Sequence, residues 1–134
     1  DREKLRNEVV EMREKMRASL ATPESRQDEV FHIKHDTGGI VDIEFIVQYL
    51  MLAWSAEHPE LTQWSDNIRQ MEELGRAGVM AVEDAEKLRE TFIALRSTIH
   101  RRALQNLNSQ VDGDAFTEER DYIRAMWKKV MIEA

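Results

Sequence analysis

Residues 34–48 form the segment whose residue types and spacing are best suited to chemistry. A pair of glycines follows a short extended stretch and precedes an apolar helix. Glycines let the backbone approach a ligand closely, and free N–H groups at the start of a helix bind anions. The candidate site residues are Lys34, Gly38, Gly39, Asp42, Glu44 and Gln48.

The two acids of this segment favour a partner other than phosphate. Asp42 and Glu44 lie in the first turns of the predicted helix, where they repel an anion. Three alternatives remain: they attract a metal ion, they attract a basic side chain, or they cap the helix. At ~100° per residue they point roughly 200° apart, so a regular helix does not let both bind one ion. Glu44 and Gln48 share a face, and an acid on a mostly apolar helix is costly when it is buried without a partner.

Other polar clusters give weaker signals. His32 and His35 are three residues apart in an extended region, and they suit a hydrogen-bonding role rather than a metal site; His58 stands alone. The Asp-Gly-Asp of residues 112–114 follows no strand pattern and is interpreted as a solvated turn. The His-Arg-Arg of residues 100–102 is interpreted as a solvated face, with docking of an acidic partner as the alternative. No nucleophile with a paired base, Walker loop or Rossmann fingerprint is present, so no catalytic or metal-binding residue is assigned.

Length and composition limit the classes of protein that are possible. The chain has 134 residues with 42% hydrophobic and 34% charged residues, which predicts one soluble globular domain. A net charge of −7 argues against nucleic-acid binding. The lack of cysteine excludes a disulfide scaffold and fits a cytoplasmic location. No apolar run reaches the ~20 residues of a membrane span. Because the chain starts at a helix-forming Asp1, we expect it to be a fragment of a larger multidomain protein.

Apolar periodicity predicts an all-α bundle of about five helices with one short extended segment before the central helix. The first helix carries an apolar stripe that includes Val9, Met12, Met16 and Leu20, and residues 1–21 are expected to pack more loosely than the rest. The short extended segment needs a partner strand, which we expect outside the chain. The helices are expected over residues 2–20, 40–57, 66–76 and 82–106, followed by a last helix capped by Thr117, with loops at 22–29 and 108–116.

Residues 34–50, with Lys34, Gly-Gly, then Asp-Ile-Glu-Phe and Gln48, resemble a signature of the glutamine synthetase adenylyltransferase/adenylyl-removing enzyme family. The similarity continues through residues 1–16, 61–67 and 120–127, and so covers essentially the whole chain. It matches the helical domain, and the flanking segments are more similar to the C-terminal, adenylylating half. The PII uridylyltransferases are the alternative family.

The resemblance implies a function in the control of nitrogen assimilation. One half of such an enzyme transfers AMP from ATP to a tyrosine of glutamine synthetase, and the other half removes it by phosphorolysis. Mg²⁺ and ATP would bind the neighbouring nucleotidyltransferase domain, whose Gly-Ser turn and metal-binding strands this sequence lacks. The motif of Lys34, Gly38, Gly39, Asp42, Glu44 and Gln48 would face that domain, completing its cleft or fixing the hinge.

The resemblance also implies glutamine synthetase, the PII signal protein and glutamine as partners. The fragment alone is expected to be inactive, to bind no cofactor by itself, and to contact neither nucleic acid nor membrane. Two other interpretations remain open: a regulatory module that binds glutamine or PII, and a purely structural bundle.

Overall fold

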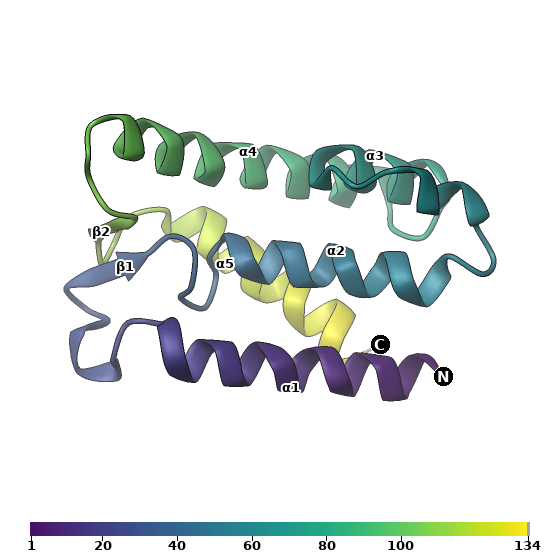
Figure 1. Ribbon diagram of the computed structural model, residues 1–134, viewed down its shortest axis with the longest axis horizontal. Helices are drawn as coiled ribbons and strands as arrows, with labels where there is room; N and C mark the ends of the chain where they lie inside the picture. The colour runs from purple at the N-terminus through teal and green to yellow at the C-terminus, as the bar shows by residue number, and fades with distance from the viewer. Residues whose placement is uncertain (134) are drawn as a thin grey trace.

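The computed structural model describes residues 1–133, and it confirms the all-α bundle. Five α-helices follow one another along these residues, with a small two-stranded sheet at one end of the bundle (Figure 1). The helices are α1 (Arg2–Leu20), α2 (Ile40–Trp54), α3 (Asn67–Arg76), α4 (Val82–Leu104) and α5 (Thr117–Trp127). The strands are β1 (Val30–His32) and β2 (Gln110–Asp112), and shorter helical turns span Glu24–Arg26, Pro59–Gln63 and Lys128–Ile132.

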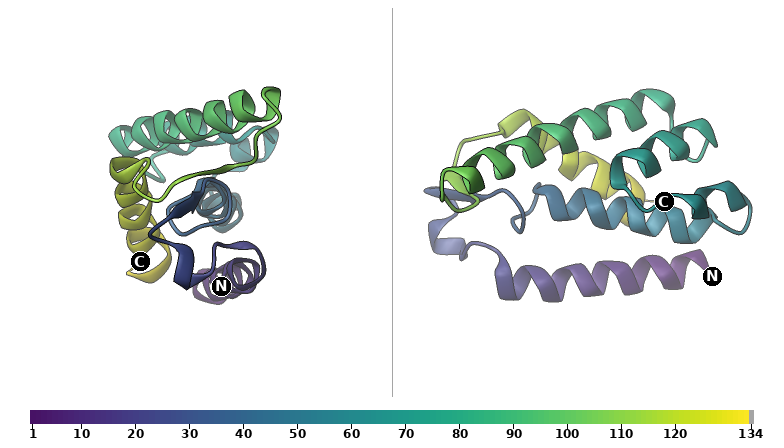
Figure 2. Two further views of the ribbon diagram at one scale, coloured as in Figure 1. Left: turned by 90° about the vertical axis from the view of Figure 1, so that its left-hand side faces the viewer. Right: turned by 45° about the horizontal axis from the view of Figure 1, so that its top comes forward.

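Helix α2 lies at the centre of the bundle. Figure 1 shows it between α1 on one side and α3 and α4 on the other, with α5 crossing behind, and α2 contacts all four helices. Eight of its 15 residues are buried, because its sequence is apolar on nearly every side. The start of α1 lies away from the sheet, toward the opposite end of the bundle, as Figure 1 and the right-hand view of Figure 2 show. The central position of α2 is what the apolar run of residues 40–54 predicts.

The expectation of a partner strand outside the chain is wrong. Strand β1 pairs antiparallel with β2, with Phe31 opposite Val111. The ladder extends at both ends, because the Ile33 N–H donates to the Ser109 carbonyl (2.9 Å) and the Gly113 N–H donates to the Glu29 carbonyl (3.1 Å). The pairing buries Phe31 and Ile33 completely. Residues 108–116 therefore contain a strand that closes the sheet within the chain.

Several helices begin or end at residues other than the expected ones. Helix α2 ends at Trp54, and the proline begins a separate helical turn, Pro59–Gln63. Helix α4 ends at Leu104, shortly before Asn106 turns to a positive φ of 59°. Helix α5 begins at Thr117, whose hydroxyl donates to the Asp114 carbonyl, so Thr117 is not the cap; Phe116 precedes it with φ 57°. Helix α3 is capped by Asp66, one of the two residues expected there.

Helix α1 packs along α2 and touches the final turn Lys128–Ile132. Its buried residues are Val9 and Arg13, whereas Met12 is 58% exposed and Leu20 is 48% exposed. The inward stripe of α1 is thus rotated from the predicted one, and an arginine occupies its centre. The looser packing of residues 1–21 stays a prediction. None of the helices within residues 1–133 is both long and apolar enough to cross a membrane.

Candidate functional site at the start of helix α2

Asp42 is held by an arginine from α1. The Arg13 Nε donates to Asp42 Oδ1 at 2.5 Å, and both side chains are almost completely buried, with 0% and 2% exposed. Arg17 Nη2 lies 3.4 Å from the same oxygen. Asp42 Oδ2 accepts a 2.8 Å hydrogen bond from the Gly38 N–H. Of the three alternatives for Asp42, pairing with a basic side chain therefore holds. Its second oxygen binds the turn before the helix, and α2, whose N-cap is Gly39, has no side-chain cap.

Arg13 also fixes the turn before α2. Its Nη2 donates to the His35 carbonyl at 2.8 Å. The turn is further closed by Asp36, which is 6% exposed and accepts hydrogen bonds from the backbone and hydroxyl of Thr22 (2.6 and 2.8 Å) and from the His32 N–H (2.7 Å). One buried arginine and one buried aspartate thus tie α1, the loop after it and the turn into a single unit.

The two glycines of the turn serve close packing. Gly38 has φ +84°, a conformation that favours glycine. A Cβ on Gly39 would lie 2.5 Å from the Ile33 carbonyl oxygen and 2.8 Å from that of Asp36. Both glycines are required by the fold of the turn itself.

The start of α2 does not offer the anion-binding geometry that its glycine pair resembles in sequence. A bound anion needs free N–H groups, but the N–H groups of residues 38–42 all have acceptors inside the chain. The acceptors, in chain order, are Asp42 Oδ2 at 2.8 Å, Asp36 O at 2.8 Å, Ile33 O at 2.8 Å, Lys34 O at 3.1 Å and Gly39 O at 3.2 Å. The start of α2 is therefore closed to phosphate.

Glu44 has a different environment from Asp42. Its side chain is partly buried on another side of α2, and Asn67 Nδ2 lies 3.5 Å from its Oε2, at the limit of a hydrogen bond. Burial raises the pKa of the Glu44 carboxyl, and the nearby Lys34 ammonium opposes that rise. Lys34 and Gln48 are exposed. Of the six predicted site residues, Asp42, Gly38 and Gly39 are thus used inside the fold, whereas Lys34, Glu44 and Gln48 present polar groups at the surface.

The two neighbouring histidines are part of the turn. Their ring centroids are 4.9 Å apart, and the His35 N–H lies 3.4 Å from His32 Nδ1. Burial lowers the pKa of both imidazoles; Asp36 opposes this for His32, and the Arg13 charge adds to it for His35. Both rings are therefore mainly neutral at pH 7, which suits hydrogen bonding within the turn.

The remaining candidates do not form a site with this segment. Asp112 and Asp114 are exposed at the end of β2. Arg102 donates to the Asn108 carbonyl at 2.6 Å, which fixes the end of α4, while His100 and Arg101 are exposed. Within residues 1–133 no three histidine or acidic side chains gather into a metal site. Since Asp42 is also bound to arginine, these residues do not fit a Mg²⁺ site.

Arg13 and Arg17 are the important residues that periodicity misses. The predicted apolar stripe of α1 continues from Val9 to Met12. Arg13, four positions after Val9, lies on the same face of the helix as Val9 and is the residue that is buried. The sequence signal is a pair of arginines four residues apart on the apolar side of one helix, together with an acid inside the apolar run of another. An acid in such a run predicts a buried cation elsewhere in the chain.

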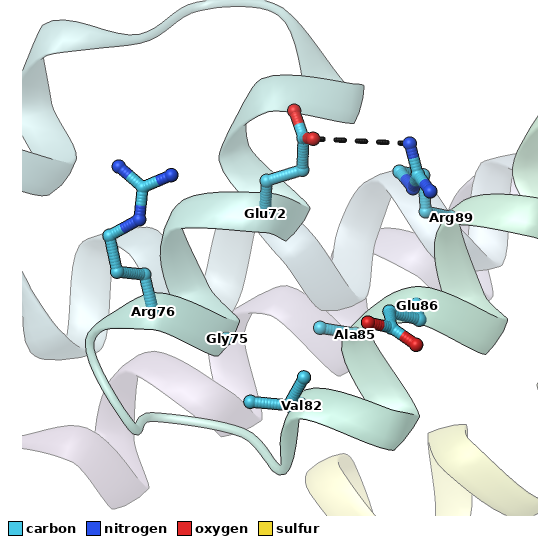
Figure 3. A pocket seen from close by; sticks show the side chains of 7 residues that line it. All are labelled: Glu72, Gly75, Arg76, Val82, Ala85, Glu86 and Arg89. Atoms are coloured by element: carbon cyan, nitrogen blue, oxygen red, sulfur yellow. Dashed lines mark ion pairs between the residues drawn. The ribbon is translucent and has the colours of Figure 1, made fainter.

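A separate hollow lies between α3 and α4 (Figure 3). It has a volume of about 340 Å³ and is floored by Gly75 and Ala85, where the helices approach so closely that a Cβ on Gly75 would lie 2.9 Å from that of Ala85. Its rim carries both signs of charge, and Arg89 Nη1 lies 3.9 Å from Glu72 Oε2. No residue of the predicted motif lines it.

We predict that Arg13→Met destabilises the chain by about 3–5 kcal/mol, because it leaves the Asp42 carboxylate buried without its main partner. Urea unfolding followed by circular dichroism measures the loss. Arg17→Met is the matched control, since Arg17 is more exposed and contacts the same oxygen at longer range; its loss should be about 1 kcal/mol. An Arg13→Met loss no larger than that of Arg17→Met would contradict the prediction.

Comparisons with known proteins find matches that cover most or nearly all of this chain. A family model described as GlnD PII-uridylyltransferase matches residues 10–122. Proteins named bifunctional glutamine synthetase adenylyltransferase/adenylyl-removing enzyme are 53% identical in Hahella chejuensis and 49% in Thioalkalivibrio sulfidiphilus, each over 99% of this chain. The Pseudomonas putida protein of the same name is 48% identical over 95% of it.

The chain spans 14% of the length of the Hahella relative and 13% of the Thioalkalivibrio one. The similarity to glutamine synthetase adenylyltransferases expected from residues 34–50 is confirmed, and the matching family model has the name of the alternative, uridylylating enzyme. The match over residues 10–122 shows that the chain belongs to the GlnD PII-uridylyltransferase family, and nearly its whole length is similar to one portion of the bifunctional adenylyltransferases.

Proposed function

We propose that the chain is a helical domain of a bifunctional glutamine synthetase adenylyltransferase/adenylyl-removing enzyme, in its adenylylating half. The observation that carries this proposal is the 53% identity with a relative of that name over 99% of the chain. The reaction is the transfer of AMP from ATP to a tyrosine of glutamine synthetase, with removal by phosphorolysis in the other half. Its partners are glutamine synthetase and the PII signal protein, and its location is the cytoplasm.

The proposed role of the chain is to pack against the nucleotidyltransferase domain of the longer protein. Lys34, Glu44 and Gln48 form the contact surface. Glu44 supports this role because its carboxyl is partly buried and has a raised pKa, while its partners within residues 1–133 are the long Asn67 contact and the nearby Lys34 ammonium. A cation or an amide from a neighbouring domain would stabilise it. Asp42, Gly38 and Gly39 hold this surface in place from inside.

In this proposal Mg²⁺ and ATP bind the neighbouring domain. Phosphoryl-type transfer depends on positioning and on electrostatic stabilisation around the metal. The present residues do not supply a metal site, since Asp42 is engaged by Arg13 and the exposed Asp112 and Asp114 belong to no metal-binding cluster within residues 1–133. What this chain contributes is a Lys34 ammonium and a Glu44 carboxyl at the edge of the contact.

The 134-residue chain alone should transfer no AMP to glutamine synthetase, because no metal-binding cluster of acidic side chains forms within residues 1–133. An assay with radiolabelled ATP, Mg²⁺ and purified glutamine synthetase measures this, with the full-length relative as the positive control. Labelled glutamine synthetase above the enzyme-free background would contradict the prediction.

Glu44→Gln in the full-length protein should lower the turnover of AMP transfer about tenfold, the equivalent of about 1.4 kcal/mol. Its melting temperature should stay within about 2 °C, because the amide keeps the shape of the carboxyl and relieves its burial. Glu90→Gln, an exposed glutamate on α4, is the control and should leave turnover unchanged. Equal turnover in both variants would remove Glu44 from the contact.

A second candidate function is the binding of a regulatory amino acid, glutamine. The hollow between α3 and α4 favours it, because its rim offers Glu72 and Glu86 for an ammonium group and Arg89 for a carboxylate (Figure 3). Its volume of about 340 Å³ lies in the range of small-molecule pockets.

If this second function holds, L-glutamine should give saturable heat in calorimetry with the chain, and Arg89→Gln should weaken binding about fivefold. Arg96→Gln, which removes a cation further along α4, should leave the affinity unchanged. Titration without heat and without a shift in melting temperature would exclude glutamine as a ligand of this hollow.

A further inference from the structure

A second and larger hollow lies where the start of α1 faces the segment that ends α5. It has a volume of about 490 Å³ and is bounded by the beginning of α1, the end of α2, residues 79–84 and the segment 126–130. Its apolar surface includes two aromatic and two thioether side chains, which are those of Tyr49, Trp54, Met80 and Met126. Its size and its mainly apolar lining are those of a small-molecule site.

The rim of this hollow is basic, although the chain as a whole is acidic. Among the residues that the structure describes, Arg2, Arg6 and Lys129 line it together with one carboxylate, that of Asp84, whereas the chain has a net charge of −7. A local excess of positive charge on an acidic protein concentrates anions at that point. The charge of the rim therefore selects an anionic ligand.

Interactions within the chain hold the rim cations at the hollow. The Arg2 guanidinium lies 3.6 Å from the centre of the Trp54 ring, donates from Nε to the Ala53 carbonyl at 3.1 Å, and pairs with Glu57. Lys129 Nζ lies 3.1 Å from Asp84 Oδ2. Side chains placed in advance lose less conformational entropy when a ligand arrives.

The Asp84 carboxylate at the hollow already has partners within the chain. Besides Lys129, Asp84 accepts from the Tyr122 hydroxyl, which lies 3.2 Å from its carbonyl and 3.4 Å from Oδ1. A cationic ligand would have to displace Lys129 in order to use it, and an anionic ligand would share Lys129 with Asp84. What favours an anion is the surplus of basic side chains in the lining.

We propose that this hollow binds a small anion with a flat apolar body, which is the chemistry of an aromatic carboxylate. The ring lies against Tyr49, Met80 and Met126, and the carboxylate faces Arg6 and Lys129. The proposal does not rest on the function proposed above. Arg2 contacts Ala53 at the end of α2, whereas Arg13 contacts Asp42 at its beginning, so the hollow and the Lys34, Glu44 and Gln48 surface lie near opposite ends of that helix.

Three probes of similar shape and different charge test the proposal on the 134-residue chain: 1-naphthaleneacetate, 1-naphthylmethylamine and 1-naphthaleneethanol. Isothermal titration calorimetry at concentrations up to about 5 mM gives each dissociation constant. The carboxylate should bind with 1:1 stoichiometry and at least about fivefold more tightly than the alcohol, and the amine should bind most weakly. The affinity of the carboxylate should fall with added salt.

The double variant Arg6→Gln with Lys129→Gln should weaken binding of the carboxylate about tenfold and leave binding of the alcohol nearly unchanged. The matched control is Lys15→Gln with Arg101→Gln, which removes the same two charges from exposed positions elsewhere. It should bind the carboxylate as the unmodified chain does. Circular dichroism of both variants establishes that they are folded.

Three results would overturn the proposal. Equal affinity for the three probes would mean that only apolar contact is recognised. Tightest binding of the amine would mean that Asp84 dominates the rim. No binding of the carboxylate at about 5 mM, or equal losses in the two double variants, would mean that the rim cations do not form a site. Each of these results leaves the assay of AMP transfer unaffected.

Discussion

The buried pair of Arg13 and Asp42 is the interaction on which the rest of the structure depends. Two charges with at most 2% exposure cannot stay apart in an apolar interior, so α1 must lie where its arginine meets the acid of α2. The same arginine holds the His35 carbonyl, and the same aspartate holds the Gly38 N–H. One pair therefore fixes a helix position, a turn and a helix start. Apolar packing alone would tolerate a sliding α1, whereas the pair admits one register.

This constraint divides the predicted motif into an inner and an outer half. Asp42 and the two glycines satisfy the backbone and the buried charge, and they leave no N–H group in residues 38–42 for an anion. Glu44 lies on another side of α2, and its carboxyl keeps a raised pKa because the chain gives it little compensation for burial. A motif that looks like one site in sequence is thus a structural clamp next to a surface that is suited to a partner. The opposite directions of residues 42 and 44 on a helix already require such a division.

The periodicity of apolar residues predicts the helices, but it does not predict the strand, the buried ion pair or the turns that connect them. The run of residues 40–54 predicted a buried central helix, and α2 is that helix. Strand β2 was missed because Gln110-Val111-Asp112 contains one apolar residue, and only its pairing with buried Phe31 makes it a strand. Arg13 was missed because a hydrophobic stripe is found by counting apolar residues, and Met12 satisfied the count although it is 58% exposed. The end of α4 before Asn106 and the start of α5 after Phe116 involve positive φ values, which asparagine favours and phenylalanine does not.

Helix α1 connects the two polar features of the molecule. Arg2 and Arg6 line the hollow beside the start of α1, and Arg13 reaches Asp42 seven residues further on, a rise of about 10 Å along a helix. Both features need α1 in the same docked position. A ligand that binds only the docked helix stabilises that position by mass action, and it thereby also stabilises the turn that carries Lys34. A ligand in the hollow would thus also stabilise the clamp through α1, whose buried side chains are Val9 and Arg13.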